Sequence, residues 1–424
     1  MMGDERKRGK PLVLVASPFQ GHMTPMLQLG SVLHSKGFSI TLAHTKLNSP
    51  DPSNHPEFVF LPLSDNFSAI DASANYTKFL EALNNNCKMQ LQDHLTRKIE
   101  EGKDEMNHTI TVIHDNIMYF AEEVASNLNL PSIVLRSCSA SYMPAFLALP
   151  RLHAEGQLPV QEVATEMLAL AERVRTPSAI IWNTMEFLES SALTQLRQHY
   201  QVPIFAIGPL IKMARCPSTS FLEEDTGCIS WLDKQAPRSV LYVSLGSLAT
   251  MDETELAETA WGLAKSKQPF LWVVRPGSVS GSEWIEFLPE GFTEEVRGRG
   301  LVLKWAPQKQ VLAHSAVGGF WSHCGWNSTL ESISEGVPMI CQPVMGDQCV
   351  NSRYLSYVWR VGLELENLEI KVVESAIRRL LVDEEGQELR QRAISMKEKA
   401  KYSLFKGGSS FNSLKDLVEF TLAD

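Results

Sequence analysis

Short apolar runs of strand length recur along the chain, separated by amphipathic stretches. In the first half these runs are Pro11–Ala16, Phe38–Ala43, Thr109–Ile113, Ser132–Leu135 and Ala179–Trp182. Short, continuous apolar runs are typical of strands that are covered on both faces. Because such runs alternate here with helical segments, the pattern predicts an α/β fold built on a parallel sheet.

The segment between the first two runs has the period of a helix. Met26, Leu29 and Leu33 recur at helical spacing. Thr24 and Pro25 are predicted to be the N-cap and the first helical residue, because a proline at that position loses no useful N–H. The chain therefore begins with a predicted β-α-β unit.

A second series follows a break in the pattern that is rich in Pro, Ser and acidic residues. The break covers Ile204–Gly208 and Arg215–Thr226 and is interpreted as a linker. Beyond it, strands are predicted at Ser239–Leu245, Phe270–Val274, Leu301–Lys304, Gly319–Trp321 and Pro338–Gln342. Helices are predicted at Met251–Lys265, Lys371–Val382, Gln387–Tyr402 and Ser410–Leu422. Thr250 and Glu253 have the spacing of a capping box for the first of these helices.

The pattern thus divides the chain into two doubly wound, Rossmann-like α/β domains. We expect the first domain at 1–210, a linker at 211–236, the second domain at 237–405, and a C-terminal helix within 406–424 that packs back on the first domain. Ligands of such folds bind beyond the carboxyl ends of the strands. Two such domains are expected to face each other across a ligand-binding cleft.

Composition narrows the class of protein. With 424 residues, 44% hydrophobic and 21% charged, the chain is of ordinary globular type. No apolar run approaches the roughly 18 residues of a membrane helix, so we expect no integral membrane segment. A net charge of −10 and the lack of a long basic run disfavour nucleic acid as a partner. Seven dispersed cysteines and a polar start to the chain predict a reduced, cytoplasmic compartment, and we expect a monomer.

The stretch Trp305–Gln348 contains the largest group of candidate ligand-binding residues. Ser328 and Glu331 have capping-box spacing, which by itself indicates only the start of a helix. His323 and Gly325 lie where a predicted strand turns into that helix. Free N–H groups at a helix N-terminus attract phosphate, and a glycine allows close backbone approach. A phosphate site and a simple helix cap both fit these residues.

The same stretch, WAPQKQVLAHSAVGGFWSHCGWNSTLESISEGVPMICQPVMGDQ, resembles without a gap the signature box of plant UDP-dependent glycosyltransferases of small molecules. Similar sequence extends from Val15 to Leu422, and the chain is most similar to the group acting on terpenoids, phenolics and cytokinins. The resemblance implies the GT-B fold, in which two Rossmann-like domains face each other across a cleft. It also implies that a UDP-sugar, rather than a bound cofactor, is the co-substrate.

The resemblance assigns the nucleoside half of the donor site. Trp305 is expected to stack on the uracil, with the backbone of Ala306 at the base edge. Gln308 and Glu331 are expected to hold the ribose hydroxyls. From the residues alone, Trp305 could equally be a core aromatic.

The resemblance assigns the rest of the donor site in the same way. Contacts to the diphosphate are expected from Ser247, His323, Asn327 and Ser328, with Gly325 beside them. Contacts to the sugar hydroxyls are expected from Trp326, Asp347 and Gln348. Gln348 at the end of the box implies glucose, so UDP-glucose is the expected donor. From spacing alone, Asp347 could be merely the N-cap of a helix over Gln348–Val358.

The resemblance implies that two residues of the first domain remove the proton of the acceptor hydroxyl and stabilise the protonated base. His22, in PFQGHMTP between the first strand and its helix, matches the catalytic base of the family. Asp115, after the strand Thr109–Ile113, matches the acid that orients this histidine and stabilises its imidazolium. A helix-capping role for Asp115 is the alternative, and His114 is a rival for the cleft. Neighbours on an extended chain point to opposite sides, and we place Asp115 toward the cleft.

The implied reaction is an inverting displacement. His22 removes a proton from an acceptor hydroxyl, whose oxygen attacks the anomeric carbon from the face opposite UDP. An imidazole with an ordinary pKa of about 6.5 can accept that proton at neutral pH. No metal is expected, because His314, His323 and Cys324 lack metal-ligand spacing.

The acceptor is expected to be a small, apolar, hydroxylated molecule, because small-molecule sites are mostly apolar. Candidate lining residues are Phe19, Met23, Met118, Tyr119, Met143, Phe146 and Met345. Ordinary core packing is the alternative for each of them. Ser137 and Ser139 are candidates to touch the transferred sugar. The chain is shorter than the family pattern over Pro159–Arg173 and after Asp65, which bears on acceptor specificity.

Other classes fit less well. A Rossmann-type oxidoreductase requires a GxGxxG motif after the first strand, and a serine hydrolase requires GxSxG. Neither motif occurs in this sequence. A protein that only binds UDP-sugar or aglycone would keep the box but would need no His22–Asp115 pair.

Overall fold

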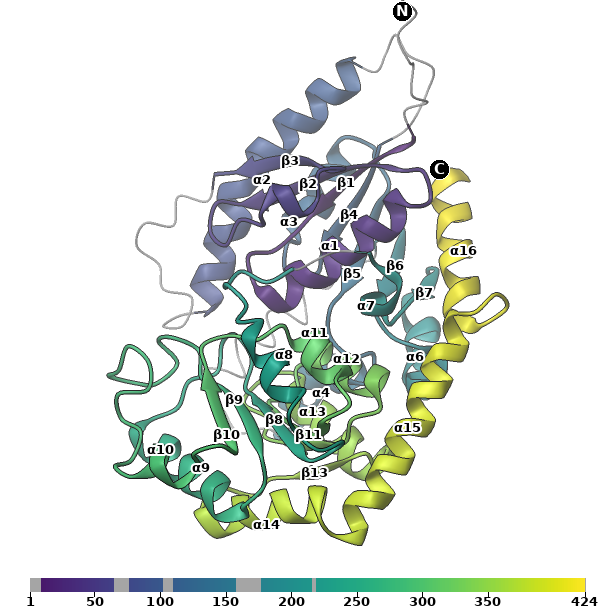
Figure 1. Ribbon diagram of the computed structural model, residues 1–424. Helices are drawn as coiled ribbons and strands as arrows, with labels where there is room; N and C mark the ends of the chain where they lie inside the picture. The colour runs from purple at the N-terminus through teal and green to yellow at the C-terminus, as the bar shows by residue number, and fades with distance from the viewer. Residues whose placement is uncertain (1–8, 65–75, 102–109, 158–176, 216–218, 424) are drawn as a thin grey trace, which may run out of the picture. The chain divides into compact units, whose positions relative to one another are not determined.

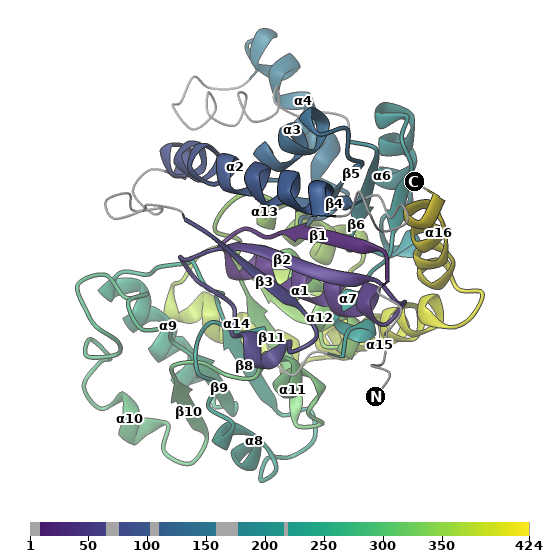
Figure 2. The same ribbon diagram turned by 90° about the horizontal axis from the view of Figure 1, so that it is seen from above.

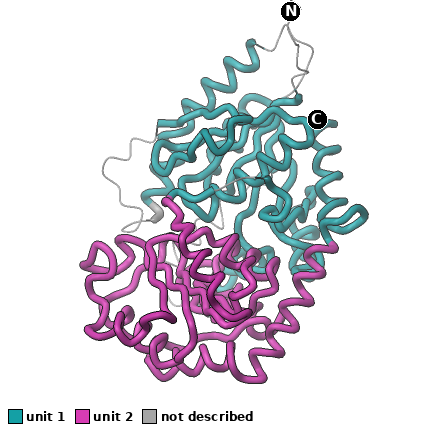
Figure 3. Tube along the Cα trace, in the orientation of Figure 1, with its two compact units in different colours: residues 1–221, 403–424 teal, residues 222–402 magenta. Residues whose placement is uncertain are grey.

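The computed structural model describes residues 9–64, 76–101, 110–157, 177–215 and 219–423. The two stretches in which the chain is shorter than the family pattern lie outside these residues. The chain forms two compact units, the first made of residues 1–221 and 403–424 and the second of residues 222–402 (Figure 3).

The first unit is built on a seven-stranded parallel sheet (Figure 1). Its strands are β1 (Pro11–Val15), β2 (Ser39–Thr45), β3 (Val59–Leu63), β4 (Thr111–Asp115), β5 (Ser132–Arg136), β6 (Ala179–Trp182) and β7 (Ile204–Ala206). Their order is β3-β2-β1-β4-β5-β6-β7. The chain runs outward from β1 to β3 and then returns to β4 on the other side of β1. The direction of winding therefore reverses between β1 and β4, and such a reversal is where open α/β sheets bind ligands.

Helices cover both faces of this sheet (Figure 2). One face carries α1 (Gln20–His34), α7 (Leu210–Met213) and α16 (Ser409–Ala423). The other carries α2 (Tyr76–Glu101), α3 (Phe120–Asn127), α4 (Tyr142–Ala154) and α6 (Glu186–Tyr200). A short 3-10 helix, η1, lies at Pro52–Asn54.

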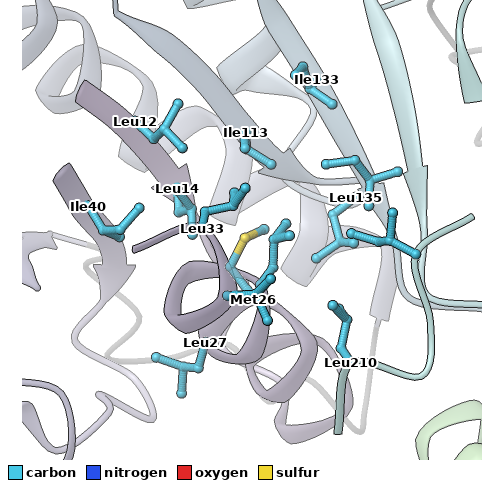
Figure 4. Packing of buried hydrophobic residues seen from close by; sticks show 14 of the residues in the cluster. Leu12, Leu14, Met26, Leu27, Leu33, Ile40, Ile113, Ile133, Leu135 and Leu210 are labelled. Atoms are coloured by element: carbon cyan, nitrogen blue, oxygen red, sulfur yellow. The ribbon is translucent and has the colours of Figure 1, made fainter. Parts of the chain in front are cut away.

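The alternation of side chains along β1 explains this layering. Leu12 and Leu14 point into the core beneath α1, whereas Val13 and Val15 join the core beneath α2 and α3. Figure 4 shows Leu12 and Leu14 converging with Met26 and Leu33 of α1. Burying a side chain of this size contributes roughly 1.5–3 kcal/mol. Because side chains on both faces of β1 are buried in apolar cores, the sequence of this strand is continuously hydrophobic.

The C-terminal helix completes the first unit. Leu414 and Leu417 of α16 are buried in the core that contains α1. The Lys10 ammonium donates to the carbonyl of Thr421, which ties the end of the helix to the chain just before β1.

The second unit holds a six-stranded parallel sheet. Its strands are β8 (Val240–Ser244), β9 (Phe270–Val273), β10 (Gly300–Leu303), β11 (Val317–Ser322), β12 (Met339–Cys341) and β13 (Gly362–Glu364). The order β10-β9-β8-β11-β12-β13 places its reversal between β8 and β11. The two doubly wound parallel sheets confirm the predicted fold class.

Helices also cover both faces of the second sheet. One face packs against α9 (Glu253–Ser266), α10 (Phe292–Glu295) and α14 (Ile370–Leu381). The other packs against α8 (Gly227–Leu232), α11 (Gln308–Ala313) and α15 (Glu384–Leu404). The elements around the end of the box are α12 (Trp326–Glu335), α13 (Gln348–Arg353) and the π-helical turn η3 (Tyr354–Val358).

Several local predictions are wrong. Helix α1 starts at Gln20 rather than at Pro25, so His22 lies in its first turn and not in a loop. The carbonyl of Phe19 accepts from the N–H groups of His22 and Met23, and this turn forms ahead of the proline. Pro25 therefore lies inside the helix, where its missing N–H removes one backbone hydrogen bond.

The other errors concern short elements. Ile204–Gly208 was interpreted as part of a linker, but it contains strand β7. The apolar pattern also predicts none of the strands β3, β7 and β13, each of which lies at an edge of its sheet. Helix α9 is capped by Asp252 and Glu255, two residues later than the predicted Thr250–Glu253 box.

Candidate active site

The first candidate group lies at the reversal of the first sheet. His22 is on the first turn of α1, directly after β1, and Asp115 is the last residue of the adjacent strand β4. His22 Nδ1 lies 2.9 Å from Asp115 Oδ2 and 3.0 Å from Oδ1. Donation from Nδ1 to a carboxylate fixes the tautomer in which Nε2 carries the lone pair.

The carboxylate of this pair is rigidly held, whereas the imidazole is accessible. Asp115 is fully buried, and its Oδ1 also accepts from the backbone N–H of Ile117 at 3.0 Å. The His22 side chain is 26% exposed. The arrangement can therefore present a basic nitrogen outward while an interior carboxylate stabilises the protonated ring.

Ser137, on the loop after β5, completes the surroundings of the imidazole. Its Oγ lies 2.9 Å from His22 Nδ1, so this hydroxyl touches the candidate base directly. Ser139 is fully buried, and its hydroxyl has no hydrogen-bond partner among the described residues. The two serines expected near the transferred sugar thus have different surroundings.

His114, the rival of Asp115, is buried. Its Nδ1 lies 3.1 Å from the carbonyl oxygen of Asp115, to which it donates. Burial lowers the pKa of His114 to about 4, which keeps its ring neutral at physiological pH.

The candidate acceptor-lining residues of the first unit belong to different apolar clusters. Phe19 is near the base, with its ring centroid 6.1 Å from that of His22. Met143 and Phe146 of α4 are buried in one apolar cluster beside β5 and β6. The rest are the fully buried core residues Met23 and Met118, the partly buried Tyr119, and Met345, which is 52% exposed in the second unit.

The second candidate group is centred on a hydrogen-bonded set of polar side chains in the second unit. The hydroxyl of Tyr242, on β8, donates to Gln308 Oε1 at 3.1 Å. Gln308 Nε2 donates to Glu331 Oε2 at 2.6 Å and to Ser328 Oγ at 3.0 Å. The amide of Gln308 is therefore fully oriented, with its oxygen toward Tyr242 and its nitrogen toward Glu331.

Burial also changes the charge of this set. Desolvation raises the pKa of Glu331 to about 7, although the bond from Gln308 and the charge of Lys309 act in the opposite direction. As a whole residue, Glu331 is only partly buried. A carboxylate placed in this way is a suitable acceptor for two neighbouring hydroxyl groups.

His323 lies at the reversal of the second sheet, directly after β11. A side chain on Gly246 would place its Cβ 2.6 Å from the ring atoms Cε1 and Nε2 of His323, and one on Gly325 would lie 2.4 Å from Nε2. Both glycines are therefore required by the position of this ring. His323 Nδ1 is buried without a partner among the described residues, and burial lowers the pKa of His323 to about 4. The ring is neutral at physiological pH.

The predicted Ser328–Glu331 capping box is wrong. Helix α12 starts at Trp326, so Ser328 lies inside its first turn and its hydroxyl bonds Gln308 instead. The chain turns into the helix through Cys324, at a positive φ of 63°, and Gly325 as N-cap, which makes no side-chain cap. A helix N-terminus without a side-chain cap retains N–H donors for an anion.

Asp347 and Gln348 lie at the start of α13. Gln348 Oε1 accepts from the backbone N–H groups of Val344 and Met345 at 2.9 and 3.0 Å. Asn351 Nδ2 donates both to Asp347 Oδ2 and to the carbonyl of Cys324, each at 3.0 Å. Asn351 thus joins the candidate sugar-binding residues to the turn that carries His323.

The remaining box residues occupy different environments. Trp305 is partly buried and packs against the cluster that contains Leu303 and Ala306, and its carbonyl accepts from the N–H of Asp225. Trp326 is buried, with its ring centroid 6.3 Å from that of Trp359. Sequence reasoning missed Tyr242 and Asn351. Tyr242 lies within an apolar strand and gives no separate signal, whereas an asparagine on the buried side of a helix could have been noticed.

The described part of the chain contains neither a metal-binding cluster nor a helix that could span a membrane. Among those residues, no three or more His, Cys, Asp or Glu side chains are grouped so as to hold a metal ion. None of the described helices is both long and apolar enough to span a membrane.

Comparison with known proteins places these observations in context. Residues 222–395 match the profile of the family described as UDP-glucoronosyl and UDP-glucosyl transferase. The chain is 52% identical over 424 residues to UDP-glycosyltransferase 76H1 of Stevia rebaudiana, covering 93% of this chain and 99% of that protein. It is 48% identical to UDP-glycosyltransferase 76E1 of Solanum lycopersicum, covering 98% and 93%.

Solved structures give the same result for the fold. The structure of TcCGT1 in complex with UDP matches with a TM-score of 0.83 and 27% identity, covering 97% of this chain and 99% of that one. The structure of Phytolacca americana UGT2 with UDP-2fluoro-glucose and pterostilbene matches with a TM-score of 0.83 and 25% identity, covering 98% and 99%.

Proposed function

Since this chain belongs to the plant family 1 UDP-glycosyltransferases, which have the GT-B fold, we propose that it transfers glucose from UDP-glucose with inversion and without a metal. The proposed acceptor is a hydroxyl group of a small apolar plant metabolite, such as a terpenoid, a phenolic or a glycoside. We place the reaction in the cytoplasm and assign it to a monomer.

The observation that carries this proposal is the bond between His22 Nδ1 and Asp115, at 2.9 Å from Oδ2. In the proposed step, the lone pair on His22 Nε2 takes the proton of the acceptor hydroxyl. The acceptor oxygen forms a bond to the anomeric carbon as the bond from that carbon to the diphosphate oxygen breaks, and UDP leaves. Asp115 stabilises the resulting imidazolium. A positioned general base contributes about 10²–10⁴-fold to a rate.

The proposed donor site belongs to the second unit. Trp305 stacks on the uracil, and Gln308 and Glu331 hold the ribose. Charge that develops on the departing diphosphate is met by N–H groups at the start of α12 and by the neutral ring of His323. Fixed donors of this kind stabilise a leaving group without reorganising during the reaction.

Glucose is proposed as the sugar on two grounds. Asp347 and Gln348 occupy the box positions that contact the sugar hydroxyls in the family, and both side chains are held in place by the bonds described above. In addition, a relative 44% identical over 452 residues, from Arabidopsis thaliana, is named as a flavonol 3-O-glucosyltransferase. That name also favours phenolic acceptors.

Mass spectrometry of reaction products tests the proposal. The protein is incubated with UDP-glucose and a pooled panel of hydroxylated phenolics, terpenoids and cytokinins. We expect an acceptor to gain the mass of one hexosyl unit, and the anomeric coupling of the product to show a β-linkage. If UDP-glucose binds in the same sample but no acceptor gains mass, the protein only sequesters its ligands. If UDP-galactose or UDP-xylose is the better donor, the assignment of glucose is wrong.

A further inference from the structure

One buried asparagine contacts two different parts of the proposed donor site. Asn351, on α13, is only 1% exposed. Its Nδ2 donates to Asp347 Oδ2 and to the carbonyl of Cys324, each at 3.0 Å. Both partners are acceptors, so the amide nitrogen faces them and both of its N–H groups are used. No other uncharged side chain of this size offers two such donors on one atom.

The amide oxygen of Asn351 is left unsatisfied. Oδ1 is buried without a hydrogen-bond partner among the described residues. A buried acceptor without a partner has a cost in free energy that an apolar side chain at this position would avoid. The two bonds that Nδ2 donates are therefore the feature that only this side chain supplies here.

The bond to Asp347 determines where the carboxylate of that residue is held. Asp347 is the N-cap of α13, a position where an aspartate usually accepts from N–H groups of its own helix. Here the side chain makes no such cap, and Asn351, one helical turn further on, donates to it instead. Asn351 thus fixes the direction of the carboxylate that is proposed to bind the sugar.

The bond to Cys324 supports the turn that enters α12. Cys324 has a positive φ of 63°, which residues other than glycine rarely adopt, so this turn needs support. Its carbonyl accepts from Asn351 Nδ2 at 3.0 Å and from Thr329 Oγ1 at 3.4 Å. In a planar trans peptide the N–H points opposite to the carbonyl, so the Gly325 N–H points away from Asn351. Among the described residues this N–H has no hydrogen-bond partner.

We propose that Asn351 is a positioning residue that holds the sugar-binding and diphosphate-binding parts of the donor site in one arrangement. Through Asp347 it directs a carboxylate at a hydroxyl of the transferred sugar. Through Cys324 it directs the Gly325 N–H at the diphosphate, where negative charge develops as UDP leaves. One amide thus aligns the sugar with the groups that receive the departing diphosphate. This inference rests on the proposed function and adds a positioning residue to it.

The test compares dissociation constants for three ligands, measured by calorimetry. They are UDP-glucose, UDP, which lacks the sugar, and UMP, which also lacks the outer phosphate. Asn351→Leu replaces the amide by an apolar side chain of similar size and removes one charge-assisted and one neutral bond. We expect the affinity for UDP-glucose to fall by about ten- to a hundredfold. The affinity for UDP should fall by only about two- to tenfold, because only the turn is disturbed, and that for UMP should fall least.

A double-mutant cycle shows whether the extra loss for UDP-glucose passes through Asp347. In Asp347→Ala, the sugar hydroxyl has already lost the carboxylate that Asn351 positions. Adding Asn351→Leu should then weaken the binding of UDP-glucose no more than that of UDP, so the extra loss disappears. A purely structural role of Asn351 predicts the same losses in both backgrounds.

Asn84→Leu is the matched control. Asn84 is 2% exposed in α2 of the first unit, and its Nδ2 also donates to two oxygens, the carbonyls of Leu80 at 2.8 Å and Ile117 at 2.9 Å. This variant should lose stability but keep the three dissociation constants. If Asn351→Leu does not fold, Asn351→Ser takes its place. It keeps a single donor for two oxygens, so it should still weaken UDP-glucose more than UMP.

The inference is overturned if Asn351→Leu leaves all three affinities unchanged or weakens them equally. It is also overturned if the extra loss for UDP-glucose persists in Asp347→Ala. The proposed function has a separate outcome. If the wild type binds UDP-glucose but transfers no hexosyl unit to any acceptor, the assignment of transfer fails, whereas the affinities still decide the role of Asn351.

Discussion

His22 and His323 occupy equivalent places in two similar sheets, yet their surroundings differ. Each lies just beyond a strand at the reversal of a doubly wound parallel sheet. His22 bonds the buried carboxylate of Asp115, and its side chain is partly exposed. His323 is fitted between two glycines, its Nδ1 has no partner among the described residues, and burial lowers its pKa to about 4.

The contrast shows that the partner, rather than the position in the fold, determines what a histidine can do. A carboxylate behind the ring stabilises the imidazolium, which suits a group that must take up a proton. A ring desolvated without a counter-charge stays neutral and can only donate or accept a hydrogen bond. The first arrangement suits activation of an acceptor hydroxyl, and the second suits binding of a diphosphate.

Apart from the loss of His22 itself, the largest effect is expected from removing the charge behind this ring. Asp115→Asn replaces a charge-assisted bond by a neutral one and no longer enforces the tautomer with a basic Nε2. We expect kcat to fall by about ten- to a hundredfold, whereas the dissociation constant of UDP-glucose stays the same. Pre-steady-state transfer rates and calorimetry provide the two values. A normal kcat in this variant would show that Asp115 has only a structural role.

Trp305, which is proposed to stack on the uracil, should affect the affinity for the donor rather than the transfer rate. Trp305→Ala removes this proposed contact, and base stacking of this kind contributes about 1–3 kcal/mol in other systems. We therefore expect weaker binding of UDP-glucose, with a smaller change in the transfer rate of the saturated enzyme. Trp305→Phe serves as the matched control and should restore most of the affinity. Equal affinity in all three proteins would remove Trp305 from the donor site.

The pH dependence of donor binding should reveal Glu331. Burial raises the pKa of its carboxyl group to about 7 in the donor-free protein. Ribose hydroxyls donate to the ionised form, so binding lowers this pKa and releases a proton. Affinity should therefore be highest above neutral pH and weaken as the pH falls through 7, by up to about tenfold per pH unit. Charges that act on Glu331 are Lys309, Glu224 and Glu335, and the Tyr242 hydroxyl reaches it through Gln308.

UDP-glucose is the appropriate ligand for this measurement, because its diphosphate carries no proton that titrates near neutral pH. Glu331→Gln should abolish the slope and bind with the low affinity seen at acid pH. A slope that survives in Glu331→Gln would assign the titration to another group.

The smallest effect is expected from Tyr242, which is linked to the proposed ribose position only through its hydrogen bond to Gln308. Tyr242→Phe removes one neutral hydrogen bond to Gln308, which corresponds to about a two- to twelvefold loss in affinity for UDP. The loss should be smaller for 2′-deoxy-UDP, which lacks one of the hydroxyls concerned. If both ligands lose affinity equally, Tyr242 supports the strand and not the recognition of ribose.

The sequence supports some parts of this account better than others. The central strands are visible as apolar runs, whereas β3, β7 and β13, which lie at the edges of the sheets, are not. All candidate donor residues except Ser247 lie within the single stretch Trp305–Gln348, so they could be named from the box. The His22–Asp115 bond joins residues 93 positions apart, and only the resemblance to a family suggested it.

Residues that act inside apolar layers were not predictable. Tyr242 lies within a hydrophobic strand, so it continues an apparent core pattern. Its role depends on which groups surround it, and that depends on the order of strands in the sheet. The start of α12 was also missed. The chain enters this helix through a backbone turn at Cys324 and Gly325, and no side chain caps the helix.

The most direct test asks whether His22 controls the transfer rate and His323 controls the affinity for the donor. Single-turnover transfer rates and UDP-glucose dissociation constants are determined for the wild type, His22→Ala and His323→Ala. The account predicts that His22→Ala loses about 10²–10⁴-fold in rate while keeping its affinity. It also predicts that His323→Ala loses mainly affinity. Near-normal transfer by His22→Ala, or a loss of affinity shared equally by both variants, would contradict it.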